Sequence, residues 1–414
     1  MKQKRRKYLC GMLILLGISA VLNLIACSKA FCDRYTDRVY PHLADAWGKL
    51  TAPLPFALGE VFGLLGGLIL LTAVISLLLL PFLRKKQGFR KYCGRLWKTV
   101  LAVLNVMLLI STLHYLIPVR CTSILDRSRR TQFSYDEVYA ATEYIVNCGD
   151  AAAEAIPLNA DGHADFPSGE ELEARAMDAL RVLEPEYPRL RGYYPPVKDS
   201  LWPDILKRMS IGGYTTEYTL ETVHSKYSCS PLYQPVLDAH EMTHHKGFYR
   251  ESEAEFISTQ AMIRSDDPYL QLAGYLAIEE YMSIAMMTAQ DAAAADLEAA
   301  GKLKPMPEGL KFRDPGFKES LREYDAALRE LLPERPYFSA RVYALVEQSR
   351  GVTQDLYEAD AHPIDSLPAV NETIGQIADT GWKTQAAVLQ EHNYEGMALL
   401  YLQYFDGTLY GTDP

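Results

Sequence analysis

The stretch HEMTHHKGFYRESEAEF, residues 240–256, decides how the second half of this 414-residue chain is organised. His240 and His244 are four residues apart, so on a helix both imidazoles project from one face, one turn apart. Residues 231–239 in front supply apolar, helix-forming side chains, and Gly247 is well placed to end the helix. The sequence therefore predicts a helix that presents two histidines together and is followed by a reversal of the chain.

Two imidazoles at this spacing can bind one Zn²⁺, each through a nitrogen at about 2 Å. Glu241 lies about 100° round the helix from His240, so its carboxylate can reach a metal-bound water without being a ligand. There it can take a proton from that water, whose pKa the metal has lowered. The alternative interpretation is an exposed amphipathic helix with incidental histidines. His245 faces another side, and we expect it to be solvated or hydrogen-bonded rather than a ligand.

An open zinc site requires a third ligand, and a glutamate-rich stretch follows Gly247 at once. On a second helix Glu251 and Glu253 would point about 200° apart, so both cannot face one metal. Glu251 and Glu255 would lie within about 40° of each other, so both can face the first helix. In the alternative interpretation, all three glutamates form a solvated helix start that the helix dipole favours.

Charge divides the chain into two parts. Residues 1–120 carry 17 Lys and Arg against 4 Asp and Glu, a formal charge of +13, whereas residues 121–414 carry 25 against 48, a formal charge of −23. An acidic domain repels polyanions, so no nucleic-acid partner is expected. We place the domain boundary at this change of sign, with a membrane anchor over 1–119 and a second domain over 120–414.

Three apolar segments in the first part have the length that crosses the hydrocarbon core of a bilayer: residues 8–27, 57–83 and 99–119. The lipid bilayer is therefore an expected partner. For the first segment the rival interpretation is a signal peptide, because LIAC at 24–27 resembles a lipoprotein cleavage box behind a basic stretch. Two further spans make a lipid anchor redundant, so retention as a transmembrane helix is favoured.

Basic residues predict the orientation of these spans. The residues before span one and residues 84–98, between spans two and three, are strongly basic, whereas the loop 28–56 is mixed. Both basic stretches are expected in the cytoplasm, which places residues 120–414 outside. One or two disulfides are compatible with that compartment, although the sequence does not assign pairs among Cys27, Cys32, Cys121, Cys148 and Cys229.

Most of residues 121–414 has helical periodicity, which predicts a mainly α fold. Ser168 stands three residues before Glu171, a capping-box pattern. Prolines make 184–198 a loop, and Tyr and Thr at alternate positions give the strongest strand signal, over 212–224. The helices are expected at about 134–156, 168–183, 268–300, 316–332, 336–349 and 385–405.

The sequence resembles an uncharacterised bacterial membrane family catalogued as domain of unknown function 3810. The likeness rests on HEMTHHKGFYRESEAEF together with YYPPVKDSL, GGYTTEYTLETVH and DDPYLQLAGYLAIEEY, and it extends into the first third through VYPHLADAW and PFALGEVF. It implies a zincin-like, membrane-anchored metallopeptidase of α+β type with H-E-x-x-H and a following E-x-E-A-N stretch. Glu255 stands here for Asn, and HHKG occurs where Gln commonly follows the second histidine. Neither change removes an expected ligand.

This resemblance also suggests roles for the glutamates. Zincins with a glutamate ligand have an E-x-x-x-D arrangement, in which the downstream acid hydrogen-bonds a ligating imidazole and fixes its tautomer. By this likeness Glu251 is the third zinc ligand beside His240 and His244, and Glu255 is the hydrogen-bonding acid. Zincins also hold the substrate backbone on a strand beside the active-site helix, for which 212–221 is the candidate.

Two functions follow from these expectations. The first is a membrane-anchored zinc endopeptidase that hydrolyses peptide or protein substrates outside the cytoplasm, with Glu241 as general base on a zinc-bound water. The second is a non-catalytic metal-binding sensor or scaffold of the cell envelope, which would have no need of Glu241. The residue that stabilises the oxyanion is left unassigned among Tyr214, Tyr249, Tyr281, His362 and His392.

Overall fold

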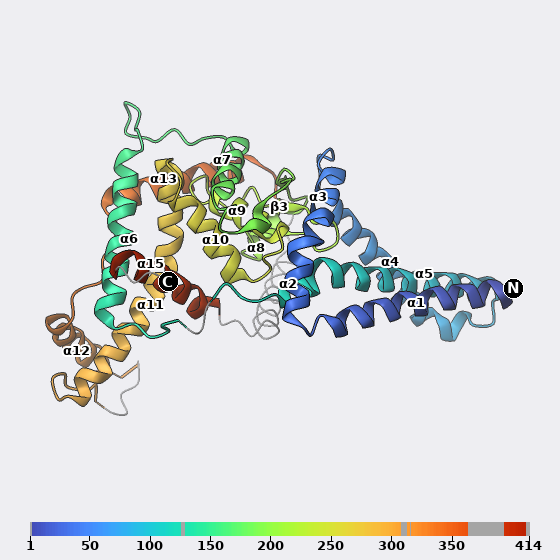
Figure 1. Ribbon diagram of the computed structural model, residues 1–414, viewed down its shortest axis with the longest axis horizontal. Helices are drawn as coiled ribbons and strands as arrows, with labels where there is room; N and C mark the ends of the chain where they lie inside the picture. The colour runs from blue at the N-terminus through green and yellow to red at the C-terminus, as the bar shows by residue number, and fades with distance from the viewer. Residues whose placement is uncertain (1, 126–128, 308–312, 315, 363–392, 411–414) are drawn as a thin grey trace.

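The computed structural model describes residues 2–125, 129–307, 313–314, 316–362 and 393–410. The prediction of a mainly helical chain is confirmed. Figure 1 shows a large helical body from which three long helices project to one side. In chain order the projecting part and its connections are α1 (Lys2–Ile25), α2 (Lys29–Arg38), α3 (Tyr40–Thr51), α4 (Leu58–Leu83), α5 (Gln87–Ser111), η1 (Thr112–Leu116) and η2 (Pro118–Arg120).

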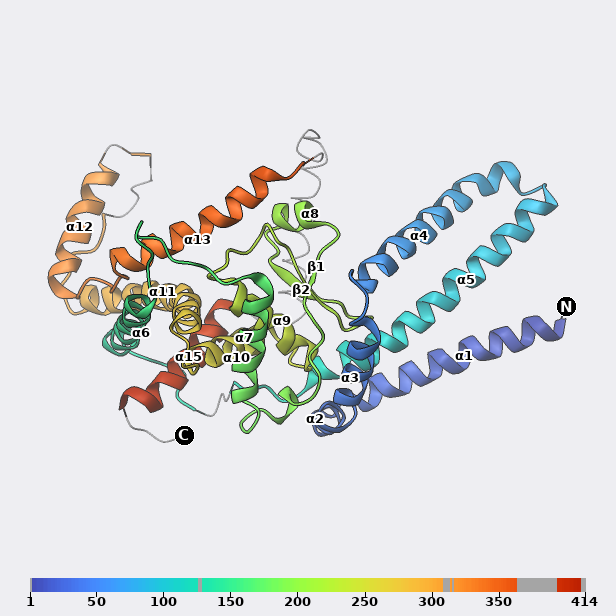
Figure 2. The same ribbon diagram turned by 90° about the horizontal axis from the view of Figure 1, so that it is seen from above.

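Each of the three segments predicted to span a membrane forms a helix long and apolar enough to do so: α1, α4 and α5 with its continuation η1 and η2. Their large apolar side chains lie on the surface, and Phe82, for example, is 80% exposed. A surface of this kind is unfavourable in water and fits a lipid environment. Figure 2 shows α4 and α5 as a hairpin, with α1 extending in the same direction.

The mixed loop between the first two spans folds into α2 and α3, which run across the ends of the three long helices (Figure 1). One face of this helix pair is buried against the body. The resulting apolar cluster combines Cys32, Tyr35, Tyr40 and Ala44 with Ile117, Cys121, Leu220 and Tyr249. The boundary expected at residue 119 therefore runs through a shared core, because residues on both sides of it bury their side chains in the same cluster.

The body is built from α6 (Tyr135–Ala155), α7 (Gly169–Val182), α9 (Gln234–His245), α10 (Glu251–Ile263), α11 (Pro268–Ala299), α12 (Phe317–Leu331), α13 (Ala340–Ala359) and α15 (Asn393–Tyr410), with the short elements η3 (Pro188–Leu190) and α8 (Pro203–Arg208). Helices α6 and α11 pack against each other, and the apolar residues buried between them belong to the main core. The predicted start of the last helix, from 385, lies outside the described residues. All seven cysteines lie inside them, and none forms a disulfide.

Local signals explain several helix ends. Ser134 and Glu137 form a reciprocal capping box at the start of α6. The side chain of Ser168 accepts a hydrogen bond from Glu171 N at the start of α7, which is one half of the predicted capping box, while the Glu171 carboxylate pairs with Arg175. The helix expected from residue 336 begins later, because Ser339 has the extended backbone of an N-cap residue. It continues to Ala359, ten residues beyond the expected end.

A small sheet is formed by β1 (Lys198–Asp199), β2 (Gly213–Thr215) and β3 (Thr222–His224) in the order β1-β3-β2. The segment predicted as strand is thus a hairpin of two short strands, with Tyr214 opposite Val223 in antiparallel register. The chain reverses between them through Leu220, whose φ is +53°. Strand β2 is an edge of this sheet and packs against α9, which carries the two histidines.

Candidate metal centre

A helical hairpin of α9 and α10 positions the candidate site. Helix α9 ends at His245, and Gly247 then reverses the chain with φ of +91°, a conformation that favours glycine. A Cβ atom at this position would lie 2.9 Å from the Cγ2 atom of Thr36, so the close approach of α2 also requires glycine. Helix α10 starts at Glu251, four residues further on.

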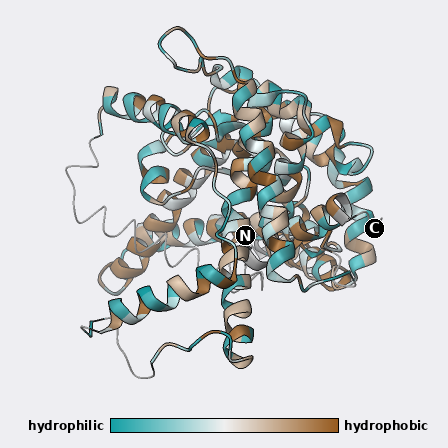
Figure 3. Ribbon diagram, turned by 90° about the vertical axis from the view of Figure 1, so that its left-hand side faces the viewer, coloured by the Kyte–Doolittle hydropathy of each residue, from teal (hydrophilic) through white to brown (hydrophobic). Residues whose placement is uncertain are grey.

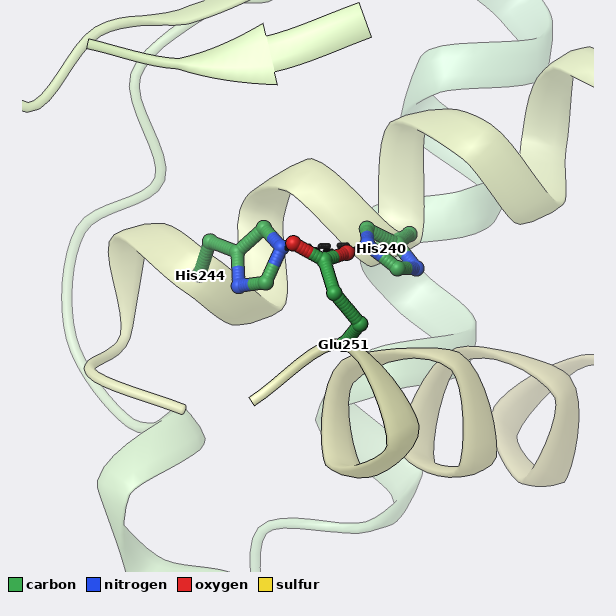
Figure 4. Close-up of side chains that lie close together, drawn as sticks. All are labelled: His240, His244 and Glu251. Carbon is green, nitrogen blue, oxygen red and sulfur yellow. Dashed lines mark hydrogen bonds and ion pairs between the residues drawn. The ribbon is translucent and has the colours of Figure 1, made fainter. Parts of the chain in front are cut away.

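The hairpin brings three metal-ligating side chains together. Figure 4 shows Glu251 reaching from the first turn of α10 to the two imidazoles on α9. The Nε2 atoms of His240 and His244 are 3.0 Å apart, and Oε2 of Glu251 lies 3.1 Å from the first and 3.5 Å from the second. A tetrahedral zinc ion with bonds of about 2.0–2.1 Å has ligand atoms about 3.3 Å apart. The donor triangle therefore has the size that zinc requires.

The remaining ring nitrogens fix the tautomers of both histidines. Nδ1 of His240 lies 2.9 Å from Oε2 of Glu255, and Nδ1 of His244 lies 2.7 Å from the carbonyl oxygen of Phe248. Both partners accept hydrogen bonds, so each Nδ1 carries the proton and each Nε2 presents its lone pair. Two lone pairs and a carboxylate then converge on one point, an arrangement that a cation stabilises.

The electrostatics of the cluster agree with this geometry. Burial lowers the pKa of His240, but hydrogen bonds to Glu251 and Glu255 outweigh it, and the pKa lies well above its ordinary value. Burial raises the pKa of Glu251, yet the charges and hydrogen bonds of the two imidazoles hold it well below its ordinary value. The site thus favours a positive charge between its ligands, supplied either by protons or by a metal ion.

Glu253, two residues along α10, is turned away from the imidazoles. Its carboxylate pairs with Nη1 of Arg250 at 2.8 Å and accepts a hydrogen bond from Ile124 N at 3.1 Å. Glu255 faces the same side as Glu251 and binds His240. The side chains of His240, His244, Glu251 and Glu255 therefore lie together, whereas the side chain of Glu253 lies on the other side of α10.

Glu241 lies beside this cluster and is only 4% exposed. The hydroxyl of Thr215, on β2, donates to the backbone oxygen of Glu241 at 2.8 Å and approaches its Oε2 atom at 3.1 Å. Burial raises the pKa of Glu241 above its ordinary value, and the nearby histidines offset only part of this effect. Sequence reasoning singled out this strand but not Thr215, since strand alternation alone does not show which helix residue a side chain meets.

Gly213 allows strand β2 to pass this close to the helix. A Cβ atom there would lie 2.7 Å from the carbonyl oxygen of Val223 and 3.2 Å from Cγ of Glu241. A larger residue would therefore push the strand away from the carboxylate.

The third histidine of the motif has a structural role. His245 is buried, and its Nδ1 lies 2.8 Å from the carbonyl oxygen of Leu220. Burial and the charge of Lys246 lower the pKa of His245 to about 3, so the ring is neutral. It is hydrogen-bonded, as the sequence suggests, and it connects α9 to the β2–β3 turn.

A second histidine contact joins β3 to the same helix. Nδ1 of His224 lies 2.9 Å from the buried carboxylate of Asp238 on α9, and its Nε2 lies 3.3 Å from Asp199. Burial lowers the pKa of His224, but the two carboxylates outweigh it and raise the pKa to about 10. The charged pair therefore ties the sheet to the metal-ligand helix, and nothing in the sequence pattern had marked it.

The five residues considered for oxyanion stabilisation lie in different places. The ring of Tyr249 stacks on His244 at 5.9 Å, and the hydroxyl of Tyr214 donates to Glu60 at 2.6 Å. Tyr281 packs against Tyr401 on α15. His362 pairs with Asp204 on α8, and His392 lies outside the described residues. Of these five residues, Tyr249 contacts the candidate centre, whereas the hydroxyl of Tyr214 is hydrogen-bonded to Glu60.

An open cleft of about 530 Å³ is lined in part by Glu255, whose carboxylate binds His240 of the candidate centre. Its walls come from the loop before β2, from α9 and α11, and from the second half of α13. The lining residues include Gly212, Tyr233, Leu237, Glu255, Glu280 and Arg350. A cleft of this size, open along one side, can hold several residues of an extended polypeptide.

The fold and the cluster define a mainly helical protein with three apolar helices and a three-residue candidate metal centre on an H-E-x-x-H helix. Residues 35–304 match the sequence model described as Protein of unknown function (DUF3810), so the chain belongs to this family. The match begins within α2, extends past the end of α11 and includes every residue of the candidate centre. No curated protein and no solved structure matches the chain.

Proposed function

We propose that this protein is a membrane-anchored, zinc-dependent peptidase with a zincin-like large domain that lies outside the cytoplasm. The observation that supports this most is the convergence of two Nε2 lone pairs and one carboxylate beside a buried glutamate. Zinc bound by His240, His244 and Glu251 would polarise a peptide carbonyl and lower the pKa of water. The donor set of two imidazoles and one carboxylate matches that of catalytic zinc sites.

Other residues of the chain would transfer the proton and hold the reacting groups in position. Glu241 takes the proton from the attacking water and passes it to the leaving amine. Thr215 holds Glu241 in place through both of its contacts. Glu255 and the carbonyl of Phe248 fix the imidazoles in the tautomer that presents Nε2.

Strand β2 is suited to hold the substrate backbone. The carbonyl of Gly212 accepts from Ser225 N, and Thr216 N donates to Glu221 O, so these residues pair with the β3 side. Backbone groups alternate in direction along an antiparallel pair. Those of Gly213 and Thr215 therefore point to the free edge, where an extended peptide can add as a further strand.

The second candidate function, a metal-binding sensor or scaffold, is favoured less. A binding site needs its ligands and the groups that orient them, but it does not need a third acid buried beside them. Burial of Glu241 costs stability, and a proton-transfer role accounts for that cost. The cleft lined by Glu255 also suits a substrate, whereas the site of a structural metal is closed.

The test uses the full-length protein in detergent or lipid nanodiscs. Metal analysis should find about one zinc per chain, and a broad peptide mixture should be cleaved. Glu241→Gln should retain zinc and lose activity by about 10²–10⁴-fold. Glu154→Gln, an exposed glutamate of α6, is the matched control and should behave as the wild type. A zinc-loaded protein that cleaves nothing, or a Glu241→Gln variant that stays active, would favour the binding function.

A further inference from the structure

The candidate metal centre is separated from the third apolar helix by one aromatic ring. Tyr249 stacks on His244 with 5.9 Å between ring centroids, and Tyr115 meets the other side of Tyr249 edge-on at 5.2 Å. Tyr115 belongs to η1, which directly continues α5. The hydroxyl of Tyr40, on α3, binds both the hydroxyl of Tyr249 at 3.0 Å and the carbonyl of His245 at 3.2 Å.

The substrate-binding edge strand is tied to the second apolar helix. Glu60 lies in the first turn of α4 and is buried. Its carboxylate accepts hydrogen bonds from the hydroxyl of Tyr214 at 2.6 Å, from the hydroxyl of Ser200 at 2.6 Å and from Leu201 N at 2.8 Å. Tyr214 is the neighbour of Thr215, which contacts Glu241. The start of α4 and the proposed general base are therefore connected through two adjacent residues.

A second set of contacts joins α4 to the turn between β2 and β3. The buried carboxylate of Glu221, in the turn between β2 and β3, caps α4 by accepting from Leu58 N at 3.0 Å and from Gly59 N at 2.9 Å. The same carboxylate pairs with buried Lys198 at 2.6 Å. A Cβ atom on Gly59 would lie 2.7 Å from Cγ2 of Thr216, so the backbone of α4 packs directly against side chains of the turn.

Exposed apolar side chains mark the level at which the body meets the bilayer. Leu50, near the end of α3, is 65% exposed, and Trp202, which follows the Glu60-bound Leu201, is 42% exposed. Lys198 holds the chain after α3 by donating to the carbonyl of Thr51 at 2.8 Å, which places both exposed residues around the start of α4. Tryptophan is enriched at the interface between a membrane and water, and an exposed leucine beside it fits the same environment.

We infer that the protein cleaves peptide bonds at a fixed, short height above the bilayer, in polypeptides that are themselves tethered to the membrane. This inference rests on the proposed peptidase function and on the three apolar helices spanning the membrane. A segment that leaves the bilayer passes this height necessarily. A folded soluble protein reaches it only by pressing against lipid, because rigid contacts to α4 and η1 keep the site from rising.

The height defines the expected cleavage position. The imidazole of His244 and the ring of Tyr115 lie on different sides of the Tyr249 ring, with 5.9 Å and 5.2 Å between ring centroids, so the metal centre lies within about 11 Å of the third apolar helix. An extended chain covers about 3.3 Å per residue. Scissile bonds about three to five residues from the membrane anchor of the substrate are therefore favoured.

The experiment uses the full-length protein in zinc-supplemented liposomes. The probe is an equimolar mixed-sequence decapeptide, attached to a single transmembrane helix either directly or through a proline-rich spacer of 20 residues, and also supplied free in solution. Such a spacer is stiff and extends about 3.1 Å per residue, so it lifts the decapeptide far above the site. Released fragments are identified by mass spectrometry.

The directly attached decapeptide should be cleaved at least tenfold faster than the spacer-lifted one, and about 10²-fold faster than the free peptide at equal bulk concentration. Glu241→Gln should abolish the cleavage of the attached peptide, which assigns it to this site. Equal rates for the attached and lifted peptides, or for the attached and free peptides, would overturn the inference and leave the peptidase function standing. No cleavage in any format by the zinc-loaded protein would remove both.

Discussion

Glu251 and Glu253 stand two residues apart on the same turn of α10, and replacing each by alanine should damage different properties. Oε2 of Glu251 lies 3.1 Å and 3.5 Å from the two imidazole Nε2 atoms. The carboxylate of Glu253 instead binds Arg250 and Ile124 N in the interior. We expect Glu251→Ala to lose zinc and Glu253→Ala to lose stability.

The sizes of the two effects can be estimated. Structural zinc in small four-ligand sites is bound with about 10–16 kcal/mol, or about 3–4 kcal/mol per ligand. Glu251→Ala should therefore weaken zinc binding by about 10²–10³-fold, with little effect on the metal-free fold. Glu253→Ala removes the carboxylate partner of Arg250 and the acceptor of Ile124 N. Breaking a buried ion pair costs about 3–5 kcal/mol of unfolding free energy, while the zinc ligands stay in place.

Zinc affinity is measured by competition with a chromophoric chelator, and stability by thermal denaturation of the metal-free proteins in one detergent. We expect Glu251→Ala to lose zinc affinity and keep its stability, and Glu253→Ala to lose stability and keep its zinc affinity. If Glu253→Ala loses zinc while Glu251→Ala retains it, the ligand assignment is reversed. If both variants bind zinc as the wild type does, the glutamates are only a solvated helix start.

Four further outcomes are expected. Glu255→Ala should weaken zinc by about 10–100-fold in the same competition assay, and a loss as large as that of Glu251→Ala would make it a ligand instead. Glu221→Ala leaves Lys198 buried without its carboxylate, so chemical denaturation should show a loss of about 3–5 kcal/mol; an unchanged midpoint would contradict the buried cap. His224 has a folded pKa of about 10 against an ordinary 6.5, so its stabilisation is complete below pH 6.5 and is lost as pH rises through 10. His224→Gln should abolish that part of the pH dependence of the thermal midpoint, and an identical slope in both proteins would refute it. A reporter active only in the cytoplasm should be active when fused near Gly88 and silent after Pro414, and the opposite pattern would invert the topology.

The parts of this structure that could be predicted from the sequence are those that depend on neighbours along the chain. Capping residues such as Ser168, the glycine that ends α9 and the apolar helix lengths all act within a few residues, so their patterns are visible in one dimension. The angular positions of Glu251, Glu253 and Glu255 follow from helix geometry alone. The structure places these three side chains as that geometry requires.

The parts that could not be predicted depend on which distant segments meet. Thr215 meets Glu241 across 26 residues, and Glu221 caps a helix that begins 163 residues earlier. Neither residue type is unusual in its local sequence. The turn at Leu220 has a positive φ without a glycine, so the segment 212–224 resembles one continuous strand. The sequence did not predict the buried apolar face of α2 and α3, because these helices lie in a connecting segment whose charges nearly cancel.

The capping of α4 by Glu221 bears on how such a protein can change over generations. Recombination commonly joins a catalytic domain to a new anchor at an exposed linker. Here a junction near residue 120 would replace Glu60 and Tyr40, leave Tyr214 and Tyr249 without their hydroxyl partners, and expose the apolar side of Leu220. We therefore expect the three apolar helices and the α9–α10 hairpin to be inherited as one unit, and a shed fragment beginning at that junction to unfold more readily than the full chain.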